Sequence, residues 1–287
     1  MPQIAIGMPV FNNQETLARS IDSVLQQTYG DFVLIISDDG STDGTWAICE
    51  YYARVDSRVL IFRQEANLRY MNFKFVLDQS QTEFFCWLAG DDYYSCFFLE
   101  KCISVLNHDA SVVCSVPKCQ FTAPAGNLSL AEGTFPIVQD EIDMRVTQYL
   151  YCPSDNTRMY GLFRSEVLRD SFPPRGFHAY DWALSAQTLC FGKHQEIDEV
   201  LIYREKTKRA LYTGAVLRDE RGLLKQLFPV FRMSVWLLRQ KKFPRRRGVV
   251  RALIWLNLVK HMEYVSNVHP DFYERSRFFY TYLKKRL

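Results

Sequence analysis

The sequence has 287 residues, of which 48% are hydrophobic and 23% charged, which excludes a disordered chain and allows a large core. Its net charge of +3 conceals an uneven distribution, because residues 208–287 hold 19 Lys and Arg against 5 Asp and Glu, whereas residues 1–207 hold 16 against 27. We therefore expect an acidic main body and a basic C-terminal region with a role of its own.

The eight cysteines include no CxxC pair and no His at zinc-finger spacing. Four of them, Cys49, Cys86, Cys102 and Cys114, lie inside apolar patterns and are expected to be reduced core thiols of a cytoplasmic protein. The N-terminal residues do not have the pattern of a signal peptide. No stretch reaches the roughly 18 apolar residues that a membrane-spanning helix needs.

The first hundred residues alternate between short apolar runs and helical patterns. The apolar runs predict strands at residues 3–10, 32–37, 58–64 and 83–89. Apolar residues at helical spacing predict helices at residues 15–28, about 43–52, and 69–79. Strands that have no polar face and are separated by helices predict a mostly parallel sheet covered by helices on both faces.

The elements after residue 96 are less regular. Helices are predicted at residues 97–109, 140–151, 165–171 and 180–190, strands at 111–122 and 196–203, and a short strand or turn at 159–163, with a loop at 124–134. Beyond residue 207, helical patterns cover residues 221–239, 249–264 and 272–287, and the sequence KKFPRRR joins the first two.

Polar residues gather where three of the predicted strands end, which is where open α/β sheets bind ligands. Asp91 and Asp92 follow the fourth strand, and Gly90 eases the turn before them. Two adjacent carboxylates can bind a hard divalent cation, which would stabilise a diphosphate as a leaving group. The alternative is an ordinary solvated turn.

The turn after the second strand reads DDGSTDGT from Asp38 to Thr45. Its carboxylate Asp39, and more weakly Asp38, could accept a hydrogen bond from the edge of a nucleotide base. An Asx-type turn followed by a helix cap explains Ser41, Thr42 and Asp43 without any ligand.

A third acidic residue, Asp181, stands at the start of a predicted helix between Tyr180 and Trp182. Transfer of a group to a hydroxyl needs a base to take the hydroxyl proton, and a carboxylate that aromatic rings partly desolvate is more basic than usual. The two rings could also stack on a sugar. The alternative interpretation of Asp181 is a helix cap.

Taken together, these segments resemble the family-2 glycosyltransferases with the nucleotide-diphospho-sugar transferase (GT-A) fold. The resemblance rests on MPVFNN at residues 8–13, LQQTY at 25–29 followed by Asp31 and Phe32, DDGSTDGT at 38–45, and Gly90-Asp91-Asp92 as the DxD-type metal motif. It covers about the first hundred residues in order and spacing. It implies a Rossmann-like GT-A domain over residues 1–207, with a nucleotide-sugar half at 1–110, an acceptor half at 111–207, and helices at 208–287.

The resemblance also implies roles for particular residues. The base pocket would be lined by Pro9, Phe11, Asn12 and Asp39, with Glu15 at its edge and Arg69 near the nucleotide or diphosphate. Asp91 would contact the ribose or the metal, and Asp92 would bind Mg²⁺ or Mn²⁺ directly. Asp181 would be the catalytic base of an inverting transfer, in which the acceptor hydroxyl attacks the anomeric carbon opposite the leaving nucleoside diphosphate.

Two departures from the family pattern concern these roles. Tyr180 stands where the family often has Glu before its base. The segment Tyr203-Arg204-Glu205-Lys206 lacks the His of the family's Tyr-Arg-x-His pattern, although Lys206 could pair with phosphate as a point charge.

We therefore expect an inverting glycosyltransferase of the hexosyltransferase type that uses a UDP- or dTDP-sugar in cell-surface polysaccharide synthesis, with a glycan or lipid-linked acceptor. The alternatives are a glycosyltransferase-like binding protein without activity, or a sugar-phosphate nucleotidyltransferase, whose usual Gly-rich opening loop is absent here. Residues 208–287 would either hold the protein on the inner, anionic face of the membrane or pack against the core or a second copy in a homodimer. No motif supports nucleic-acid binding.

Overall fold

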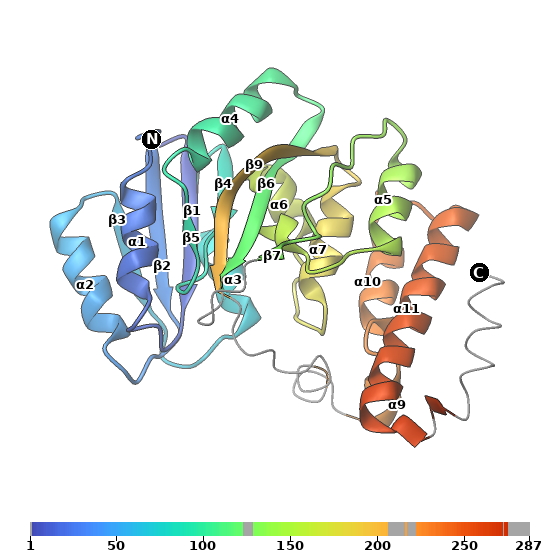
Figure 1. Ribbon diagram of the computed structural model, residues 1–287. Helices are drawn as coiled ribbons and strands as arrows, with labels where there is room; N and C mark the ends of the chain where they lie inside the picture. Colours follow the sequence, from blue (N-terminus) through green and yellow to red (C-terminus); the bar gives the residue numbers. More distant parts are fainter. Residues whose placement is uncertain (1, 123–128, 206–215, 217–221, 272, 275–287) are drawn as a thin grey trace. The chain divides into compact units, whose positions relative to one another are not determined.

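A computed structural model of the chain describes residues 2–122, 129–205, 216, 222–271 and 273–274 (Figure 1). Contacts within the chain divide it into two compact units. Unit 1 consists of Met1–Val138, Ser154–Pro174 and Gly192–Thr207, and unit 2 consists of Gln139–Pro153, Arg175–Phe191 and Lys208–Leu287. The last change of unit falls at the predicted boundary after residue 207, but unit 2 also takes two segments from before it. The predicted domain division stays a prediction.

Unit 1 contains one mixed sheet. Its strands are β1 Ile4–Val10, β2 Phe32–Asp38, β3 Val59–Arg63, β4 Phe84–Trp87, β5 Tyr93–Tyr94, β6 Val112–Thr122, β7 Ser129–Leu130, β8 Leu162–Arg164 and β9 Lys193–Glu205. They lie in the order β3-β2-β1-β4-β8-β6-β9-β5, with β7 beside β6. The pairs among β3, β2, β1 and β4 are parallel, as is β6 with β9, whereas β8, β5 and β7 pair antiparallel.

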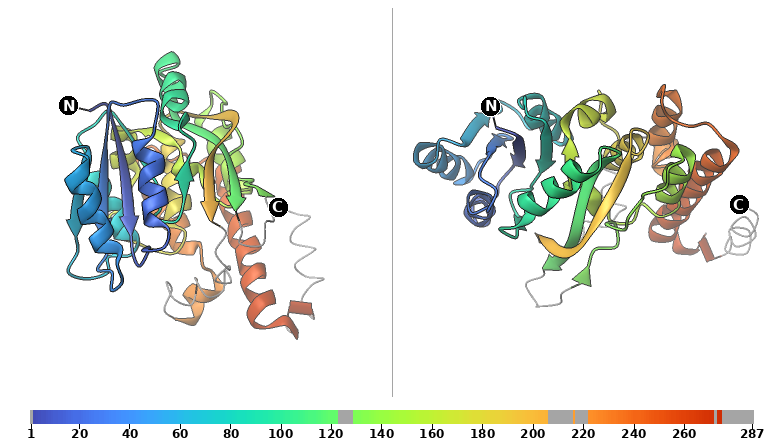
Figure 2. Two further views of the ribbon diagram at one scale, coloured as in Figure 1. Left: turned by 60° about the vertical axis from the view of Figure 1, so that its left-hand side comes forward. Right: turned by 90° about the horizontal axis from the view of Figure 1, so that it is seen from above.

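Helices cover both faces of this sheet. They are α1 Leu17–Leu25, α2 Thr45–Val55, α3 Tyr70–Asp78, α4 Phe98–His108 and α6 Ser165–Ser171, and a 3₁₀ helix, η1, covers Thr157–Tyr160. Seen from above, α1 and α4 lie on one side of the strands and α3 and α6 on the other (Figure 2).

The alternation along β1 explains the two-layered core. Ile4, Ile6, Met8 and Val10 belong to the core cluster that also holds buried residues of α1, α2 and α4. Gly7 faces α3 instead, where an added Cβ would lie 2.5 Å from the Phe85 ring and 2.6 Å from Val76. The close approach of α3 to the sheet therefore requires a residue without a side chain at this position.

Unit 2 is helical. It contains α5 Ile142–Tyr151, α7 Tyr180–Thr188, α9 Leu223–Leu227, α10 Phe231–Arg239 and α11 Arg247–Val268. α11 packs against α5 and α9, and α10 packs against α7 (Figure 1). In the part of the chain that the structure describes, no helix combines the length and apolar character needed to cross a bilayer.

Most predicted elements within the described residues are confirmed to within a few residues, with two differences. β5 and β7 have two residues each and were not predicted, because such short strands have no periodicity. The helical pattern at residues 221–239 forms two helices, because α9 ends at Leu227 and α10 begins at Phe231, with Pro229 between them. The helix predicted at 272–287 lies almost wholly outside the described residues.

Candidate functional site at the carboxyl ends of the strands

The carboxyl ends of β1, β2 and β4 lie side by side at one edge of the sheet. Val10 pairs in register with Asp38, and the Asp39 N–H donates to the Val10 carbonyl oxygen at 2.8 Å. β4 lies parallel on the other side of β1, and the Leu88 N–H donates to the Gly7 carbonyl oxygen. The loops after these strands carry nearly all the residues predicted to bind a nucleotide sugar, so the structure brings them to one edge.

The loop after β1 is tied to the loop after β2. The Asn12 N–H donates to Ser41 Oγ at 2.9 Å, and Asn12 Oδ1 accepts from the Thr42 N–H at 2.9 Å. The Asn13 N–H donates to Thr45 Oγ1 at 2.7 Å. Asn12 has a positive φ of 53°, a conformation that Asn adopts more readily than most residues. Asn12 therefore shapes this edge through its own backbone and side chain.

The other predicted residues of the first loop differ in exposure. Phe11 is 46% exposed, which is unusual for a large aromatic side chain beside a core strand. Pro9 is half-buried and Glu15 is exposed. An exposed ring at this position offers an apolar face to a flat ligand.

Asp39 is buried and bound on both carboxylate oxygens. Its Oδ1 accepts from the Leu68 N–H at 2.6 Å and its Oδ2 from the Arg69 N–H at 2.9 Å, and the residue is 4% exposed. Burial raises the pKa of Asp39, and the two backbone hydrogen bonds oppose that shift. Each oxygen retains a second lone pair, so Asp39 can still accept a hydrogen bond from a ligand.

Asp38, the neighbour of Asp39, is fully buried. Its Oδ1 accepts from the Ser41 N–H at 3.1 Å, and Arg63 Nε lies 3.6 Å from Oδ2, beyond hydrogen-bond distance. Asp43 Oδ1 accepts from the Thr45 N–H at 3.0 Å, at the start of α2. The turn interpretation of Ser41, Thr42 and Asp43 thus accounts for their contacts within the chain.

Arg69 stands directly before α3 in a strained conformation. Its φ of 55° and ψ of −127° belong to a region that residues with a Cβ rarely adopt. The Asp39 carboxylate holds the N–H groups of both Leu68 and Arg69, so this acid fixes the strained segment. The Arg69 side chain itself is exposed.

The turn that contains Asp91 and Asp92 is held against the start of α1. The Gly90 carbonyl oxygen accepts from Thr16 Oγ1 at 2.8 Å and from Ser20 Oγ at 3.0 Å. Arg19 Nη2 donates to the Asp91 carbonyl oxygen at 2.8 Å. These hydroxyl and guanidinium contacts come from a helix some seventy residues earlier in the chain, and no sequence motif indicated them.

Asp92 is buried in an ion pair. Its Oδ2 lies 3.2 Å from Arg204 Nε, and its Oδ1 accepts from the Glu205 N–H at 3.0 Å. Asp92 is 3% exposed, and burial raises its pKa to about 7 although Arg204 acts against the shift. Asp91 is half-buried; burial raises its pKa as well, and the charge of Glu205 adds to the effect.

The donor set at this turn suits a hard divalent cation, because it consists of carboxylate oxygens. The described residues contain no group of three or more His, Cys, Asp or Glu side chains arranged to hold a metal ion. Asp91 and Asp92 together would therefore supply two protein ligands at most, and the diphosphate and water would have to supply the others. Such partial coordination is usual for Mg²⁺ bound with phosphates. Lys206, the predicted phosphate contact, lies outside the described residues.

The predicted catalytic base and acceptor residues lie in unit 2. Tyr180, Asp181 and Trp182 form the first turn of α7, and all three are half-buried. Ala179, the residue before the helix, has a positive φ of 61°. Lys260 Nζ lies 4.9 Å from the centre of the Trp182 ring. A carboxylate in the first turn of a helix is favoured by the helix dipole.

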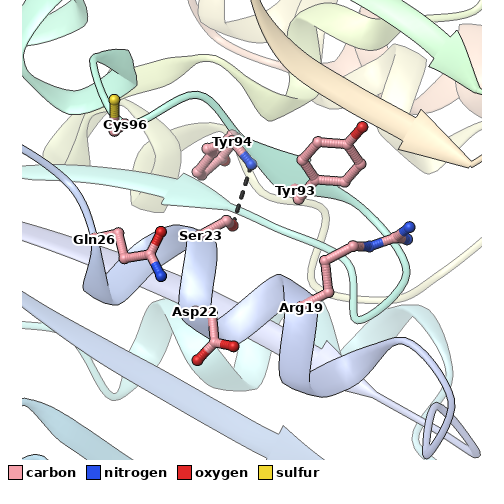
Figure 3. Close-up of a pocket in the computed structure, with 7 residues that line it drawn as sticks. All are labelled: Arg19, Asp22, Ser23, Gln26, Tyr93, Tyr94 and Cys96. Carbon is pink, nitrogen blue, oxygen red and sulfur yellow. Dashed lines mark hydrogen bonds between the residues drawn. The ribbon is translucent and has the colours of Figure 1, made fainter.

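A cavity of about 430 Å³ lies between α1 and β5, and sequence reasoning gave no sign of it (Figure 3). It is lined by Arg19, Asp22, Ser23, Gln26, Tyr93, Tyr94 and Cys96. The Arg19 guanidinium lies 4.8 Å from the centre of the Tyr93 ring, and Tyr93 stacks on Tyr203. The Tyr93 ring is thus in contact with an arginine and with a second aromatic ring, and Arg19 also contacts the Asp91 turn.

A family model covers the part of the chain that contains this strand-end edge. The family model described as "Glycosyl transferase family 2" matches residues 5–170, which include the loops after β1, β2 and β4. The chain belongs to this family.

Relatives of known sequence match over shorter segments. Glycosyltransferase GlyG of Streptococcus pneumoniae is 36% identical over 62 residues, 22% of this chain and 21% of GlyG. The Campylobacter jejuni GalNAc(5)-diNAcBac-PP-undecaprenol beta-1,3-glucosyltransferase is 33% identical over 97 residues, 32% of this chain and 30% of the relative. These matches therefore span less than a third of each relative's length.

Solved structures match over nearly the whole chain. Staphylococcus aureus TarS superposes with a TM-score of 0.62 at 14% identity, over 96% of this chain and 55% of TarS, and a shorter TarS chain has been solved in complex with UDP-GlcNAc. The mannosyltransferase PcManGT of Pyrobaculum calidifontis, in complex with GDP-Man and Mn²⁺, gives a TM-score of 0.61 at 14% identity over 92% of this chain and 73% of PcManGT. The predicted α/β fold of the GT-A type is confirmed.

Proposed function

We propose that the chain is an active glycosyltransferase, which moves a sugar from a UDP- or dTDP-sugar to a hydroxyl group of a glycan or lipid-linked acceptor. The observation that carries the proposal is the construction of the strand-end edge. The loops after β1, β2 and β4 are joined by hydrogen bonds, and they contain the buried Asp39 and Asp92 and the exposed Phe11. Asp39 also accepts from the N–H of Arg69, whose side chain is exposed. Such an edge suits a ligand with a flat base at one end and a diphosphate at the other.

The donor would lie along this edge from the base to the sugar. The ring of Phe11 and the backbone near Pro9 and Asn12 would contact the base, whose imide N–H would donate to Asp39. Asp38, behind Asp39, would keep the turn in place, and exposed Glu15 would close the edge of the pocket. Arg69 would pair with the diphosphate, because its guanidinium can bind two phosphate oxygens at once.

Asp91 and Asp92 would hold Mg²⁺ or Mn²⁺ at the diphosphate. When bound, the cation would neutralise the charge that develops on the departing nucleoside diphosphate. The acids of the chain would orient the diphosphate for departure. PcManGT, whose fold is similar, contains Mn²⁺ together with GDP-Man, which supports the proposed cation.

We propose Asp181 as the base of an inverting reaction. The acceptor oxygen would form a bond to the anomeric carbon while the bond from that carbon to the diphosphate oxygen breaks, and the Asp181 carboxylate would take the hydroxyl proton. Half-buried Tyr180 and Trp182 would contact the acceptor sugar. The carboxylate can take the proton only in its ionised form.

A screen of nucleotide sugars by thermal shift, with and without Mn²⁺, tests donor binding, because a ligand that binds only the native state raises Tm. With the donor found, Asp181→Asn should keep donor binding and lose roughly 10²–10⁴-fold in transfer rate, the range for removing a general base. Full transfer by this variant would refute the role of Asp181. Donor binding by the wild-type chain without any transfer would favour the non-catalytic binding protein.

We also propose that unit 2 contacts an anionic membrane surface. Residues 239–251 contain seven Lys and Arg and no acid, and all seven basic side chains are exposed. Arg246 pairs with Asp143 at 3.2 Å, and Asp143 lies between Ile142, 38% exposed, and Met144, 57% exposed. A basic cluster beside exposed apolar side chains suits anionic lipid headgroups.

Flotation with vesicles tests this partner. The triple variant Lys241→Gln, Arg247→Gln, Arg251→Gln should bind phosphatidylglycerol vesicles more weakly by about 3 kcal/mol, roughly 100-fold, at about 1 kcal/mol per charge. The matched control Arg54→Gln, Lys74→Gln, Lys101→Gln removes three charges from unit 1 and should bind as wild type. A wild-type chain that ignores such vesicles but sediments as a dimer would favour packing against a second copy.

A further inference from the structure

Arg204, near the end of β9, has a set of contacts that the proposed roles do not use. Its Nε lies 3.2 Å from Asp92 Oδ2, and its Nη1 donates to Thr157 Oγ1 at 3.2 Å. The guanidinium carbon lies 4.4 Å from the centre of the Tyr160 ring and 5.5 Å from that of Phe121. One side chain thus joins the Asp91-Asp92 turn to η1 and is held by two aromatic rings.

The next residue, Glu205, completes the attachment of the turn. Its N–H donates to Asp92 Oδ1 at 3.0 Å, and its carboxylate pairs with Arg19 at 3.3 Å. Arg19 in turn donates to the Asp91 carbonyl oxygen. Consecutive residues of β9 therefore fix Asp92 through its side chain and, by way of Arg19, Asp91 through its main chain.

The carboxylates of Asp91 and Asp92 consequently differ in the hydrogen bonds that they accept. Both Asp92 oxygens already accept hydrogen bonds, and its side chain is 4% exposed. The Asp91 carboxylate accepts no hydrogen bond from any other residue in the described part of the chain. A cation approaching the turn would therefore meet an Asp91 carboxylate that is bound only by its own N–H within the described residues. At Asp92 the cation would have to share one oxygen with Arg204 and the other with the Glu205 N–H.

The charged groups around the turn also support this difference between Asp91 and Asp92. Three carboxyl groups, those of Asp91, Asp92 and Glu205, lie around the turn with two guanidinium groups, those of Arg19 and Arg204. A buried carboxylate that loses its only cationic partner is strongly destabilised, or it turns towards another cation. Without Arg204, Asp92 would be free to rotate away from the Glu205 N–H and to change the shape of the cation site.

We propose that Arg204 is a positioning residue, which holds Asp92 as a fixed anchor of the turn and so presents Asp91 as the carboxylate that meets the cation and the donor diphosphate. The proposal rests on the proposed function, since it concerns how that site binds its donor. The arginine of the Tyr203-Arg204 part of the family pattern would thus have a positioning role. Thr157 and the ring of Tyr160 support Arg204 from η1.

The test measures Mn²⁺ binding, with UDP present as the probe, from the electron paramagnetic resonance signal of the free ion. Arg204→Gln should weaken Mn²⁺ binding about 10- to 100-fold, the usual effect of removing a partner of a metal ligand. Arg204→Lys should recover only part of this loss, because an ammonium group keeps the charge but not the fork that reaches both Asp92 and Thr157. Asp91→Asn should abolish binding.

Arg58→Gln is the matched control. Arg58 also pairs with an acid, Asp56 at 2.7 Å, and also lies over an aromatic ring, Phe32 at 4.5 Å, but it stands before β3, at the amino ends of the strands. This variant loses the same kinds of contact and should bind Mn²⁺ as wild type. A purely structural role for Arg204 would give the two Gln variants equal Mn²⁺ affinities.

Two further variants separate binding from folding. Thr157→Val removes only the hydroxyl that holds Arg204 Nη1 and should weaken Mn²⁺ binding in the same direction by a smaller factor. The double variant Asp92→Asn, Arg204→Gln should have a higher Tm than Arg204→Gln alone, since it leaves no unpaired buried carboxylate.

The outcomes also distinguish the inference from the proposed function. If the wild-type chain binds neither Mn²⁺ nor UDP, the proposed function fails and the positioning role with it. If the wild type binds both but Arg204→Gln and Thr157→Val bind Mn²⁺ with unchanged affinity, only the positioning role of Arg204 is overturned.

Discussion

Acidic side chains are exposed at the amino ends of the parallel strands and buried at the carboxyl ends. At the amino ends, the Gln3 N–H donates to Asp31 and the Gln3 amide donates to Glu83, both at 3.1 Å, and both acids are exposed. At the carboxyl ends, Asp39 and Asp92 are 4% and 3% exposed and are bound by N–H groups or by an arginine. The same strands and the same core thus support two different polar surfaces.

The carboxyl ends of the strands contain features that lower the stability of the fold. Burying a carboxylate is unfavourable even when it is paired, and each residue held at an unfavourable φ and ψ costs about 1–3 kcal/mol. Asn12 and Arg69, two of the residues with positive φ, stand at the carboxyl ends of β1 and before α3. Buried carboxylates and strained residues at the carboxyl ends of the strands are typical of a binding site at that end.

The largest expected effect comes from Asp39. Asp39→Ala removes the acceptor of the Leu68 and Arg69 N–H groups and, in our account, of the donor base. Hydrogen bonds to charged groups contribute about 1.5–3 kcal/mol each, so donor affinity should fall roughly 100-fold. Asp31→Ala, the matched change at the amino end, should leave donor affinity unchanged. Equal donor affinities in calorimetric titrations of the two variants would remove the distinction between the ends.

A smaller effect should come from the strain at Arg69. Arg69→Gly should be more stable than Arg69→Ala by about 1 kcal/mol, because glycine adopts a positive φ without a steric penalty. Both variants should bind the donor more weakly than wild type, since both lose the guanidinium. Urea unfolding measures the first difference and titration the second. Equal stability of the two variants would mean that this segment stores no strain.

The smallest effect is expected at the amino end, from the Asp56–Arg58 pair. The hydrogen bond from Arg58 lowers the pKa of Asp56 below its usual value of about 3.9. A lowered pKa in the folded state gives stability that is present above the unfolded pKa and is lost as the pH falls through the folded pKa. Asp56→Asn should therefore cost less than about 1 kcal/mol at pH 6 and almost nothing near pH 2, as measured by urea unfolding at both pH values. If Asp56→Asn lowered the free energy of unfolding by the same amount at both pH values, the ion pair would not be the cause.

The sequence was enough to predict which acids lie at the carboxyl ends of the strands. Continuous apolar runs such as residues 32–37 have few alternatives to a buried strand, and polar residues directly after them must meet at one edge if the sheet is parallel. That reasoning located Asp39, Asp91 and Asp92 together. It could not predict β5, whose two residues carry no pattern, or the division of residues 221–239, where the helical spacing outweighed Pro229.

The hydrogen-bond partners of the acids could not be predicted. Asp92 and Arg204 are 112 residues apart, and Asp39 and Arg69 are 30 apart, so no local pattern joins them. Arg204 was visible only as part of the Tyr-Arg pair in the family pattern. The sequence indicates which residue types carry the chemistry, but which carboxylate is paired and which is open depends on contacts between distant segments.

A crystal structure of the chain grown with UDP and Mn²⁺ would show directly whether the donor binds at the carboxyl ends of the strands. We expect the uracil beside Phe11 with its imide N–H directed at Asp39, and the cation next to Asp91 with Arg204 still bound to Asp92. Nucleotide density at another place, such as the cavity between α1 and β5 that Arg19 and Asp22 line, would contradict the assignment of the donor site to the carboxyl ends of the strands.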